Sequence, residues 1–366
     1  MTTYSVAVVG TGPDPENPSV EGFAMGYRHA EAFASDDRCD LVGCADIVEA
    51  NREAFADTFD LPAGTAYADY EAMLADLEPD VVSVAVPPQI HESIVVGCAR
   101  SEVVDAIHCE KPMADTWGGA QRMTQAAWRH DVQLTFNRQR RFARPFTAAK
   151  ELLDDGAIGD LERVEIGWGD FFDTGAHTVD LAGMFAGDVP AEWVLAGLDY
   201  RDEDVRFGAH QENQMWAQWR YENGVYGASS TGKGTDFVGA TMRLRGSEGE
   251  LVVDADDGPM LELRQGGDRR EIGVDGEGIH RTNTEAEDRF GSHFHDRAAA
   301  EIIDSLETDT DSILSARLGL NTAEILFSGY ESVRRRGRVD LPLAVDDHPL
   351  EAMVDAGDIT PTGSDD

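Results

Sequence analysis

The sequence predicts an α/β protein with two structured domains, a doubly wound parallel sheet followed by an α+β domain with a large, mostly antiparallel sheet. Short apolar runs alternate with helical stretches up to residue 137, as in parallel sheets whose strands are buried on both faces. Longer runs of alternating polar and apolar residues follow, which is typical of antiparallel strands. We therefore assign residues 1–137 to the first domain, 138–354 to the second and 355–366 to a disordered acidic tail.

The composition narrows the classes of function. The chain has 366 residues, of which 42% are hydrophobic, and a formal net charge of −40. Such charge is tolerable where salt screens it, so we predict a halophilic, cytoplasmic protein. Nucleic acid is not expected as a partner, because the chain is strongly negative and has no continuous stripe of basic residues. No signal peptide or apolar span of membrane length is found, so no membrane partner is expected.

The first strand and the turn after it predict a dinucleotide site. An apolar run leads into Gly10-Thr11-Gly12, where glycines permit a tight turn and close approach of the backbone to a phosphate. The second strand ends in Asp46, whose carboxylate suits the adenosine ribose and disfavours a 2′-phosphate, so NAD is favoured over NADP. The loop 13–25 is longer than the compact motif, which puts Gly26 in doubt as a phosphate contact. A turn that only begins a helix is the structural alternative.

Lysine is nearly absent from the chain, which makes one of its positions informative. Only Lys111, Lys150 and Lys233 occur. Lys111 lies between Glu110 and Pro112 just beyond a strand, where a half-buried ammonium can donate to a substrate oxygen. Pro112 fixes the backbone there and is a candidate for a cis peptide bond. An ion pair that merely closes the strand end explains the same residues equally well.

Other residues are weaker candidates. The apolar run 80–86 ends at Pro87, and His91 opens the next helix, so His91 is a candidate to approach the cofactor or substrate. A single histidine is more often a cap or a packed residue. His293 and His295 lack the further ligands of a metal site, and none is predicted. Three aromatic residues are candidates to wall a sugar pocket, although aromatic residues on such strands more often belong to the core: Trp168, Phe171 and Phe172. The cysteines are expected to be reduced core residues: Cys39, Cys44, Cys98 and Cys109.

In their order and spacing these motifs resemble the Gfo/Idh/MocA family of NAD(P)-dependent oxidoreductases, named after glucose-fructose oxidoreductase, inositol dehydrogenase and a rhizopine catabolism protein. The resemblance covers almost the whole chain. The segments that carry it are Gly10-Thr11-Gly12, the helix with His29, Asp46, Val86-Pro87-Pro88-Gln89-Ile90-His91, Glu110-Lys111-Pro112, Asn137-Arg138-Gln139-Arg140-Arg141-Phe142, Asp173-Thr174-Gly175-Ala176-His177-Thr178-Val179-Asp180, Gly246-Ser247-Glu248-Gly249-Glu250 and Gly337-Arg338-Val339-Asp340-Leu341-Pro342.

The resemblance implies that catalysis rests on Lys111 together with Asp173 and His177, which are four residues apart. A helix that begins there would place both side chains on one face. In such a site His177 removes the hydroxyl proton as hydride leaves carbon, Asp173 orients His177, and Lys111 stabilises the developing alkoxide. The alternative is a capped helix, with Asp173 as N-cap and His177 on the surface.

The resemblance also implies the ligands and partners. The cofactor is NAD, with NADP as the alternative, and its expected contacts are Gly10, Thr11, Gly12, Asp46, Pro87, His91, Glu110 and Lys111. The substrate is a sugar, a polyol or an inositol-like compound, with expected contacts from Lys111, Arg141, Asp173 and His177. Members of the family associate through the C-terminal sheet, which implies a homodimer or homotetramer. A cofactor-binding sensor that kept the fold but lost turnover is the alternative function.

Overall fold

The computed structural model describes residues 3–15, 24–279 and 293–362, and it divides into two compact units. Unit 1 holds the described residues up to 139, except 115–118, together with 293–319; unit 2 holds 115–118, 140–279 and 320–362. The expected border at residue 137 is therefore close to the observed one. The return of residues 293–319 to unit 1 has no local sequence signal, because the helix in that segment packs against α1 (Met25–Ala34), which lies far away in the chain.

Unit 1 is built on a six-stranded parallel sheet with the order β3-β2-β1-β4-β5-β6. This doubly wound order confirms the Rossmann prediction. Its middle strands are buried on both faces, and Val81, Val82 and Val84 of β4 have no exposed surface. The strands are β1 (Tyr4–Val9), β2 (Cys39–Ala45), β3 (Ala66–Tyr67), β4 (Val81–Val84), β5 (Ala106–Cys109) and β6 (Gln133–Phe136).

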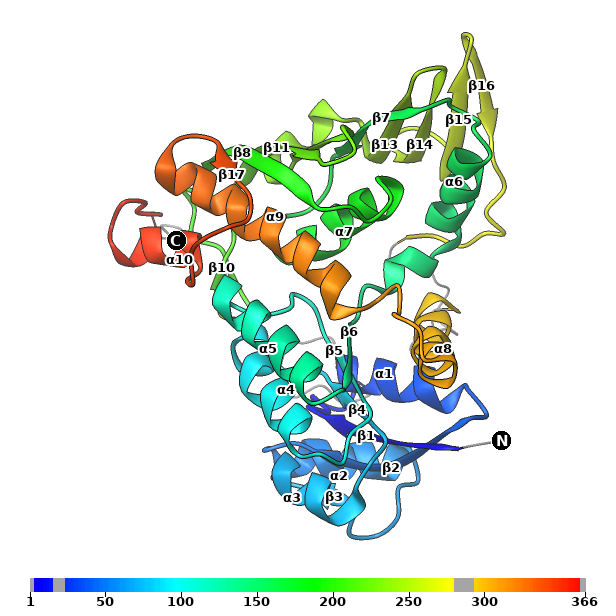
Figure 1. Ribbon diagram of the computed structural model, residues 1–366, viewed down its shortest axis with the longest axis vertical. Coiled ribbons are helices and arrows are strands. Elements are labelled where there is room, and N and C mark those ends of the chain that lie inside the picture. Colours follow the sequence, from blue (N-terminus) through cyan, green and yellow to red (C-terminus); the bar gives the residue numbers. More distant parts are fainter. Residues whose placement is uncertain (1–2, 16–23, 280–292, 363–366) are drawn as a thin grey trace. The chain divides into compact units, whose positions relative to one another are not determined.

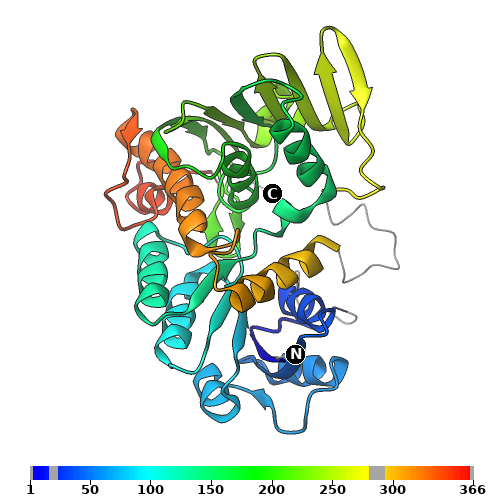
Figure 2. The same cartoon turned by 45° about the vertical axis from the view of Figure 1, so that its right-hand side comes forward.

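Helices cover both faces of this sheet (Figures 1 and 2). On one face Tyr27 of α1 meets Phe55 of α2 edge to face, with ring centroids 5.0 Å apart, and α8 packs against α1. On the other face α3 packs against α4, beside α5. The helices are α1 (Met25–Ala34), α2 (Glu49–Thr58), α3 (Tyr70–Leu77), α4 (His91–Arg100), α5 (Trp117–Arg129) and α8 (His293–Thr308), with a 3₁₀ turn η1 (Pro88–Ile90). The four cysteines are free and buried, as expected.

Unit 2 is built on a nine-stranded sheet with the order β16-β15-β14-β13-β7-β12-β11-β8-β17. Every neighbouring pair is antiparallel except β12 and β7, so the prediction of a large, mostly antiparallel sheet is confirmed. Its strands are β7 (Leu161–Ile166), β8 (Ala191–Asp199), β11 (Gln214–Tyr221), β12 (Tyr226–Ser230), β13 (Ala240–Gly246), β14 (Gly249–Ala255), β15 (Leu261–Gln265), β16 (Asp268–Glu271) and β17 (Val339–Asp340), while β9 (Val205–Arg206) and β10 (Ala209–His210) form a separate pair.

The two faces of the nine-stranded sheet differ in cover. On β11 alternate side chains, among them Met215 and Trp219, are fully buried on the face that α7 and α9 cover (Figure 1). Gly329 of α9 lies so close that a Cβ atom there would stand 2.9 Å from the methyl carbon of Met215. On the opposite face Trp216 of the same strand is 51% exposed. The helices of unit 2 are α6 (Arg144–Asp154), α7 (Gly175–Phe185), α9 (Ala316–Arg335, which begins in unit 1) and α10 (Pro349–Asp355), with 3₁₀ turns η2 (Gln139–Phe142) and η3 (Gly232–Phe237).

The prediction that residues 355–366 form a disordered tail is corrected in part. Residues 356–362 continue from α10 and return to the loop after β8. Thr362 donates a backbone hydrogen bond of 2.6 Å to the carbonyl of Arg201, and its hydroxyl donates to the same oxygen at 2.9 Å. These bonds to a distant loop order a segment whose own composition favours disorder. Residues 363–366 lie outside the described residues. No helix within the described parts of the chain is long and apolar enough to cross a membrane.

Candidate functional site

The glycine turn after β1 has the geometry of a close backbone approach. Gly10 and Gly12 adopt φ values of +85° and +70°, which favour glycine. A Cβ atom on Gly10 would stand 2.8 Å from the carbonyl oxygen of Ala85. Gly26, in the first turn of α1, is equally constrained, since its Cβ would lie 2.5 Å from the oxygen of Gly10. Gly26 therefore lets the helix pack against the turn, a steric role that is separate from the phosphate contact that its displaced position had put in doubt.

Asp46 ties the end of β2 to this turn. Its Oδ2 accepts hydrogen bonds from the backbone N–H of Gly12 at 3.2 Å and from the hydroxyl of Thr11 at 3.1 Å. Its Oδ1 accepts from the N–H of Val48 at 2.8 Å. The nearby cation, Arg52, faces the main-chain oxygen of Asp46 and the carboxylate of Glu49, at 3.4 and 3.5 Å. Three of the predicted cofactor residues, Thr11, Gly12 and Asp46, are thus in mutual contact.

Lys111 lies at the carboxyl end of β5, on the same edge of the parallel sheet as the glycine turn after β1. The side chain is half-buried, and the Lys111–Pro112 peptide is cis. Glu110 beside it is buried; its Oε1 accepts hydrogen bonds from His29 Nε2 at 2.9 Å and Asn137 Nδ2 at 2.7 Å, and its Oε2 from the backbone N–H of Lys111 at 3.0 Å. Burial by itself would raise the pKa of Glu110, but the hydrogen bond and electrostatic attraction of His29, the charge of Lys111 and the hydrogen bond from Asn137 outweigh it and hold that pKa below its usual range.

His91 and Glu110, two of the expected cofactor contacts, are buried inside unit 1. His91 has no exposed surface; its Nε2 lies 2.8 Å from the carbonyl oxygen of Val86 and its Nδ1 lies 3.0 Å from that of Pro112. Burial lowers the pKa of His91. His91 thus joins the segment after β4 to the segment after β5. Pro87, in the segment after β4, is exposed and directly precedes η1.

In unit 2 Asp173 lies in the turn before α7, and His177 lies in its first turn. Asp173 is half-buried and His177 is 3% exposed. The helix begins at Gly175, two residues after Asp173, so the expected helix is present but starts later. The residue that caps this turn is Asp170, not Asp173: its Oδ1 accepts hydrogen bonds from the backbone N–H groups of Asp173 at 2.6 Å and Thr174 at 3.0 Å. Sequence reasoning missed Asp170, although a short acid three residues before Asp173 is a capping signal.

A second buried acid, Glu212, supports the same turn. Its Oε1 accepts from the N–H of Phe171 at 2.7 Å and the hydroxyl of Thr231 at 2.8 Å, and its Oε2 accepts from the hydroxyl of Tyr330 at 2.7 Å. Burial and the negative charge of Asp170 raise the pKa of Glu212 to about 7. No sequence signal marks this residue, because its partners come from three distant segments. Phe171 and Phe172 are core residues, at 0% and 2% exposure.

Arg141, an expected substrate contact, is committed to two carboxylates. Its guanidinium donates to Asp180 through Nε at 2.7 Å and Nη2 at 2.8 Å, and to Asp188 through Nη2 at 2.7 Å and Nη1 at 3.0 Å. The Arg141 side chain is 2% exposed. Burial alone would lower the pKa of Arg141, but the two carboxylates raise this pKa by more than burial lowers it, so the arginine is always charged. In this arrangement Arg141 anchors η2 to α7, and all three of its guanidinium nitrogens are engaged by carboxylates of the same unit.

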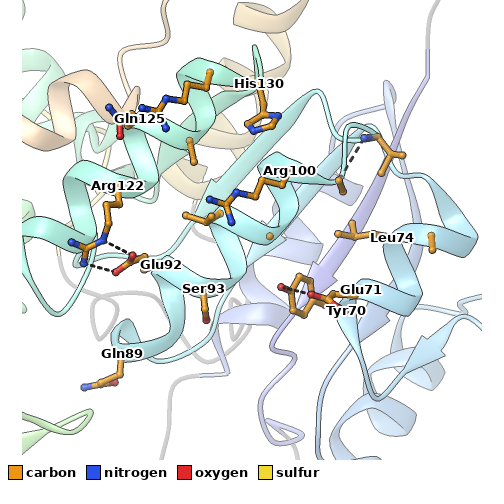
Figure 3. A pocket seen from close by; sticks show the side chains of 17 residues that line it. Tyr70, Glu71, Leu74, Gln89, Glu92, Ser93, Arg100, Arg122, Gln125 and His130 are labelled. Carbon is orange, nitrogen blue, oxygen red and sulfur yellow. Dashed lines mark hydrogen bonds and ion pairs between the residues drawn. The ribbon is translucent and has the colours of Figure 1, made fainter.

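Two further features lie away from these residues. His295 is buried beside Phe294, and the described residues contain no cluster of three or more potential metal ligands. A groove of about 1000 Å³ opens on unit 1 between α3, α4 and α5 (Figure 3). Its wall carries a bidentate ion pair between Arg122 and Glu92, with N–O distances of 2.6 and 2.9 Å. None of the predicted site residues lines this groove.

Comparison with known proteins gives consistent matches. Residues 5–138 match the profile of an oxidoreductase family with an NAD-binding Rossmann fold, GFO_IDH_MocA, and residues 150–341 match the C-terminal alpha/beta domain of that family. A myo-inositol 2-dehydrogenase of Thermotoga maritima is 24% identical over 63% of the chain and 72% of its own length. An inositol 2-dehydrogenase of Rhizobium meliloti is 27% identical over 45% of the chain, which spans about half (53%) of that relative.

A solved structure supports the fold over nearly the whole chain. An oxidoreductase from Agrobacterium radiobacter, in complex with NAD⁺, L-tartaric acid and magnesium, superimposes with a TM-score of 0.73 at 19% identity. The match covers 93% of this chain and 98% of that one. With both of its domains matched, the chain belongs to the GFO/IDH/MocA family of oxidoreductases.

Proposed function

We propose that the protein is an NAD-dependent dehydrogenase that oxidises a secondary hydroxyl of a polyol, an inositol-like compound or a sugar. The observation that carries this proposal is the placement of Lys111 at the carboxyl edge of the parallel sheet, the same edge as the glycine turn held by Asp46. Ligands of doubly wound sheets bind at that edge. Inositol dehydrogenases among the relatives support a polyol, and the commitment of Arg141 to Asp180 and Asp188 argues against a phosphorylated substrate.

The proposed mechanism assigns one task to each side chain. Bound NAD supplies the hydride acceptor. The Lys111 ammonium donates a hydrogen bond to the substrate oxygen and stabilises the alkoxide that develops there. His177 takes the hydroxyl proton, since an imidazole titrates near neutral pH, and Asp173 orients or charge-stabilises it. Pro87, Gly10, Thr11 and Gly12 are proposed cofactor contacts, whereas Glu110 and His91 act from inside the fold.

NAD is proposed over NADP from the surroundings of Asp46. Its carboxylate stands at the end of β2, where a 2′-phosphate would meet a like charge. Arg52 is turned toward Glu49 and the main-chain oxygen of Asp46, so no cation is presented to such a phosphate by these residues. The preference is measured as the ratio of kcat/KM for NAD to that for NADP.

The open face of the nine-stranded sheet is the proposed surface of a homodimer or homotetramer. One half of it exposes Leu195, Trp216 and Tyr226 at 44%, 51% and 38%. The other half carries alternating charges, in which Glu250 lies 3.0 Å from Arg264 and 3.3 Å from Arg243. An apolar patch beside a network of ion pairs suits a specific contact between two copies of the same surface. The net charge of −40 makes a salt-rich cytoplasm the proposed location.

The test is absorbance at the reduced-nicotinamide band, in multimolar KCl, with NAD or NADP and a panel of inositols, polyols and aldoses. Turnover with one substrate class establishes the reaction. Binding of NAD without turnover on any substrate would instead favour the alternative, a cofactor-binding sensor of the same fold.

With a substrate in hand, Lys111→Ala and His177→Ala are each expected to lower kcat/KM by about 10³-fold, with NAD affinity unchanged within about threefold. The double variant should fall little further, because groups that act on one transition state are not additive. Lys150→Ala is the control, since Lys150 pairs with Asp154 on the outside of α6. Wild-type turnover in either single variant would remove that residue from the mechanism.

A further inference from the structure

A chain of hydrogen bonds runs through the interior of unit 1 to the residue before Lys111. Ser83 Oγ of β4 lies 2.6 Å from His29 Nδ1 of α1, and His29 Nε2 lies 2.9 Å from Glu110 Oε1. Asn137, just after β6, donates to the same carboxylate oxygen at 2.7 Å. All four side chains belong to buried residues, with exposures of 0%, 2%, 6% and 1% for Ser83, His29, Glu110 and Asn137. Side chains from α1 and from the end of β6 therefore meet at one carboxylate, and Ser83 of β4 is linked to it through His29.

The contacts of His29 are compatible with a simple arrangement of the protons. If the Ser83 hydroxyl donates to Nδ1 of His29, the neutral imidazole carries its proton on Nε2 and donates it to Glu110. Glu110 then remains a carboxylate that accepts from both His29 and Asn137, and the Asn137 amide nitrogen also lies 3.0 Å from Nε2 of His29. The other oxygen of Glu110 accepts the backbone N–H of Lys111 at 3.0 Å. One oxygen of the carboxylate is thus held by His29 and Asn137, and the other oxygen accepts from the backbone of the lysine.

Fold stability is a poor explanation of so costly an arrangement. Burying a carboxylate carries a desolvation penalty that hydrogen bonds repay only in part, and apolar replacements of such networks are often as stable. The network ends on the only lysine of unit 1, the other two being Lys150 and Lys233 of unit 2. The charges of Glu110 and Lys111 attract each other. A rigid carboxylate therefore sets both the backbone and the electrostatic surroundings of that ammonium.

We propose that His29, acting through Glu110, is a positioning residue for Lys111. This inference rests on the proposed function, in which the Lys111 ammonium contacts the substrate oxygen. His29 itself touches neither substrate nor cofactor. Its donor holds the Glu110 carboxylate in place, and Glu110 in turn holds the lysine in the orientation that donates to the developing alkoxide.

The proposal can be tested without a substrate, because the protein has three lysines in distinct settings. We would measure the acetylation rate of each lysine by peptide mass spectrometry, in the folded full-length protein in KCl. Glu110→Gln removes the counter-charge of the ammonium, and His29→Leu removes the donor that holds this counter-charge in place, so each should raise the rate at Lys111 by about threefold or more. Lys150 and Lys233, paired with Asp154 and Asp202, should not change. His29→Gln should restore the wild-type rate, because its amide can donate where Nε2 did.

Turnover supplies the second readout. With a substrate identified, His29→Leu is expected to lower kcat by tenfold or more with NAD affinity unchanged, and His29→Gln to stay within about threefold of wild type. His130→Leu, at the exposed end of α5, is the matched control. Unchanged acetylation of Lys111 in both His29→Leu and Glu110→Gln would overturn the positioning role. If His29→Leu does not fold, Glu110→Gln alone decides. A changed Lys111 rate in a protein that turns over no substrate would leave the positioning of the lysine intact and remove only the proposed reaction.

Discussion

Two buried glutamates, one in each unit, show how differently the same side chain behaves beside the proposed catalytic residues. Glu110 accepts three hydrogen bonds, from His29, Asn137 and the backbone of Lys111. Glu212 also accepts three, from Phe171, Thr231 and Tyr330. Yet the pKa of Glu110 lies below its usual range, whereas that of Glu212 is raised to about 7.

The difference lies in the formal charges nearby. Burial raises the pKa of both carboxyls, and hydrogen bonds lower both. Electrostatic attraction to His29 and Lys111 lowers the pKa of Glu110, while the negative charge of Asp170 raises that of Glu212. Hydrogen-bond number alone therefore does not decide the protonation of a buried acid. The lysine turn rests on a permanent carboxylate, and the turn with Asp173 rests on an acid that can gain a proton near neutral pH.

Asp180 is a third buried acid, and it forms a direct ion pair with the guanidinium of Arg141. Arg141→Ala would leave Asp180, at 1% exposure, buried without that cation, so the free energy of unfolding is expected to fall by about 3–5 kcal/mol. Urea titration measures this change. Arg144→Ala is the control, because its pair with Glu151 is partly exposed and should contribute less than about 1 kcal/mol. A folded Arg141→Ala protein of normal stability but with a raised KM would return Arg141 to the list of substrate contacts.

Glu212→Gln tests the raised pKa through the pH dependence of stability. Between about pH 4.5, the reference value, and pH 7 the folded protein holds a proton on Glu212 that the unfolded chain has released. The wild-type free energy of unfolding therefore falls across this window as the pH rises, and glutamine removes that contribution. The stability of Glu212→Gln relative to wild type is expected to rise by about 1–3 kcal/mol from pH 4.5 to pH 8.

Urea titrations at several pH values measure this difference. Glu222→Gln, on the exposed turn after β11, is the matched control and should show no such trend. A constant difference between Glu212→Gln and wild type at all pH values would mean that Glu212 titrates as an ordinary acid, and the contrast with Glu110 would be lost.

The same contrast explains what could be predicted from the sequence. Strand ends carry their own signals, so the glycine turn, Asp46 and the position of Lys111 beyond β5 followed from local patterns. The cis bond before Pro112 was also foreseen as a candidate. Glu212 had no such signal, since its partners Phe171, Thr231 and Tyr330 lie 41, 19 and 118 residues away.

Arginine roles were the hardest to predict. Arg141 was expected to contact substrate, but an arginine beside a proposed site looks the same in sequence whether it meets a ligand or a carboxylate of its own chain. Asp188, which accepts from its guanidinium, is 47 residues away. The return of α8 to unit 1 was missed for the same reason, because long-range pairing leaves no periodic trace in a single sequence.

The smallest effect is expected at the cap of the Asp173 turn. Asp170→Ala removes the acceptor for the N–H groups of Asp173 and Thr174, and the free energy of unfolding should fall by about 1–2 kcal/mol. Asp170→Asn keeps an acceptor oxygen but lacks the charge that raises the pKa of Glu212. It should therefore retain the cap and also weaken the pH dependence of stability between pH 4.5 and 7. If Asp170→Asn instead left that dependence unchanged, burial alone would set the protonation of Glu212, and nearby charge would no longer account for its difference from Glu110.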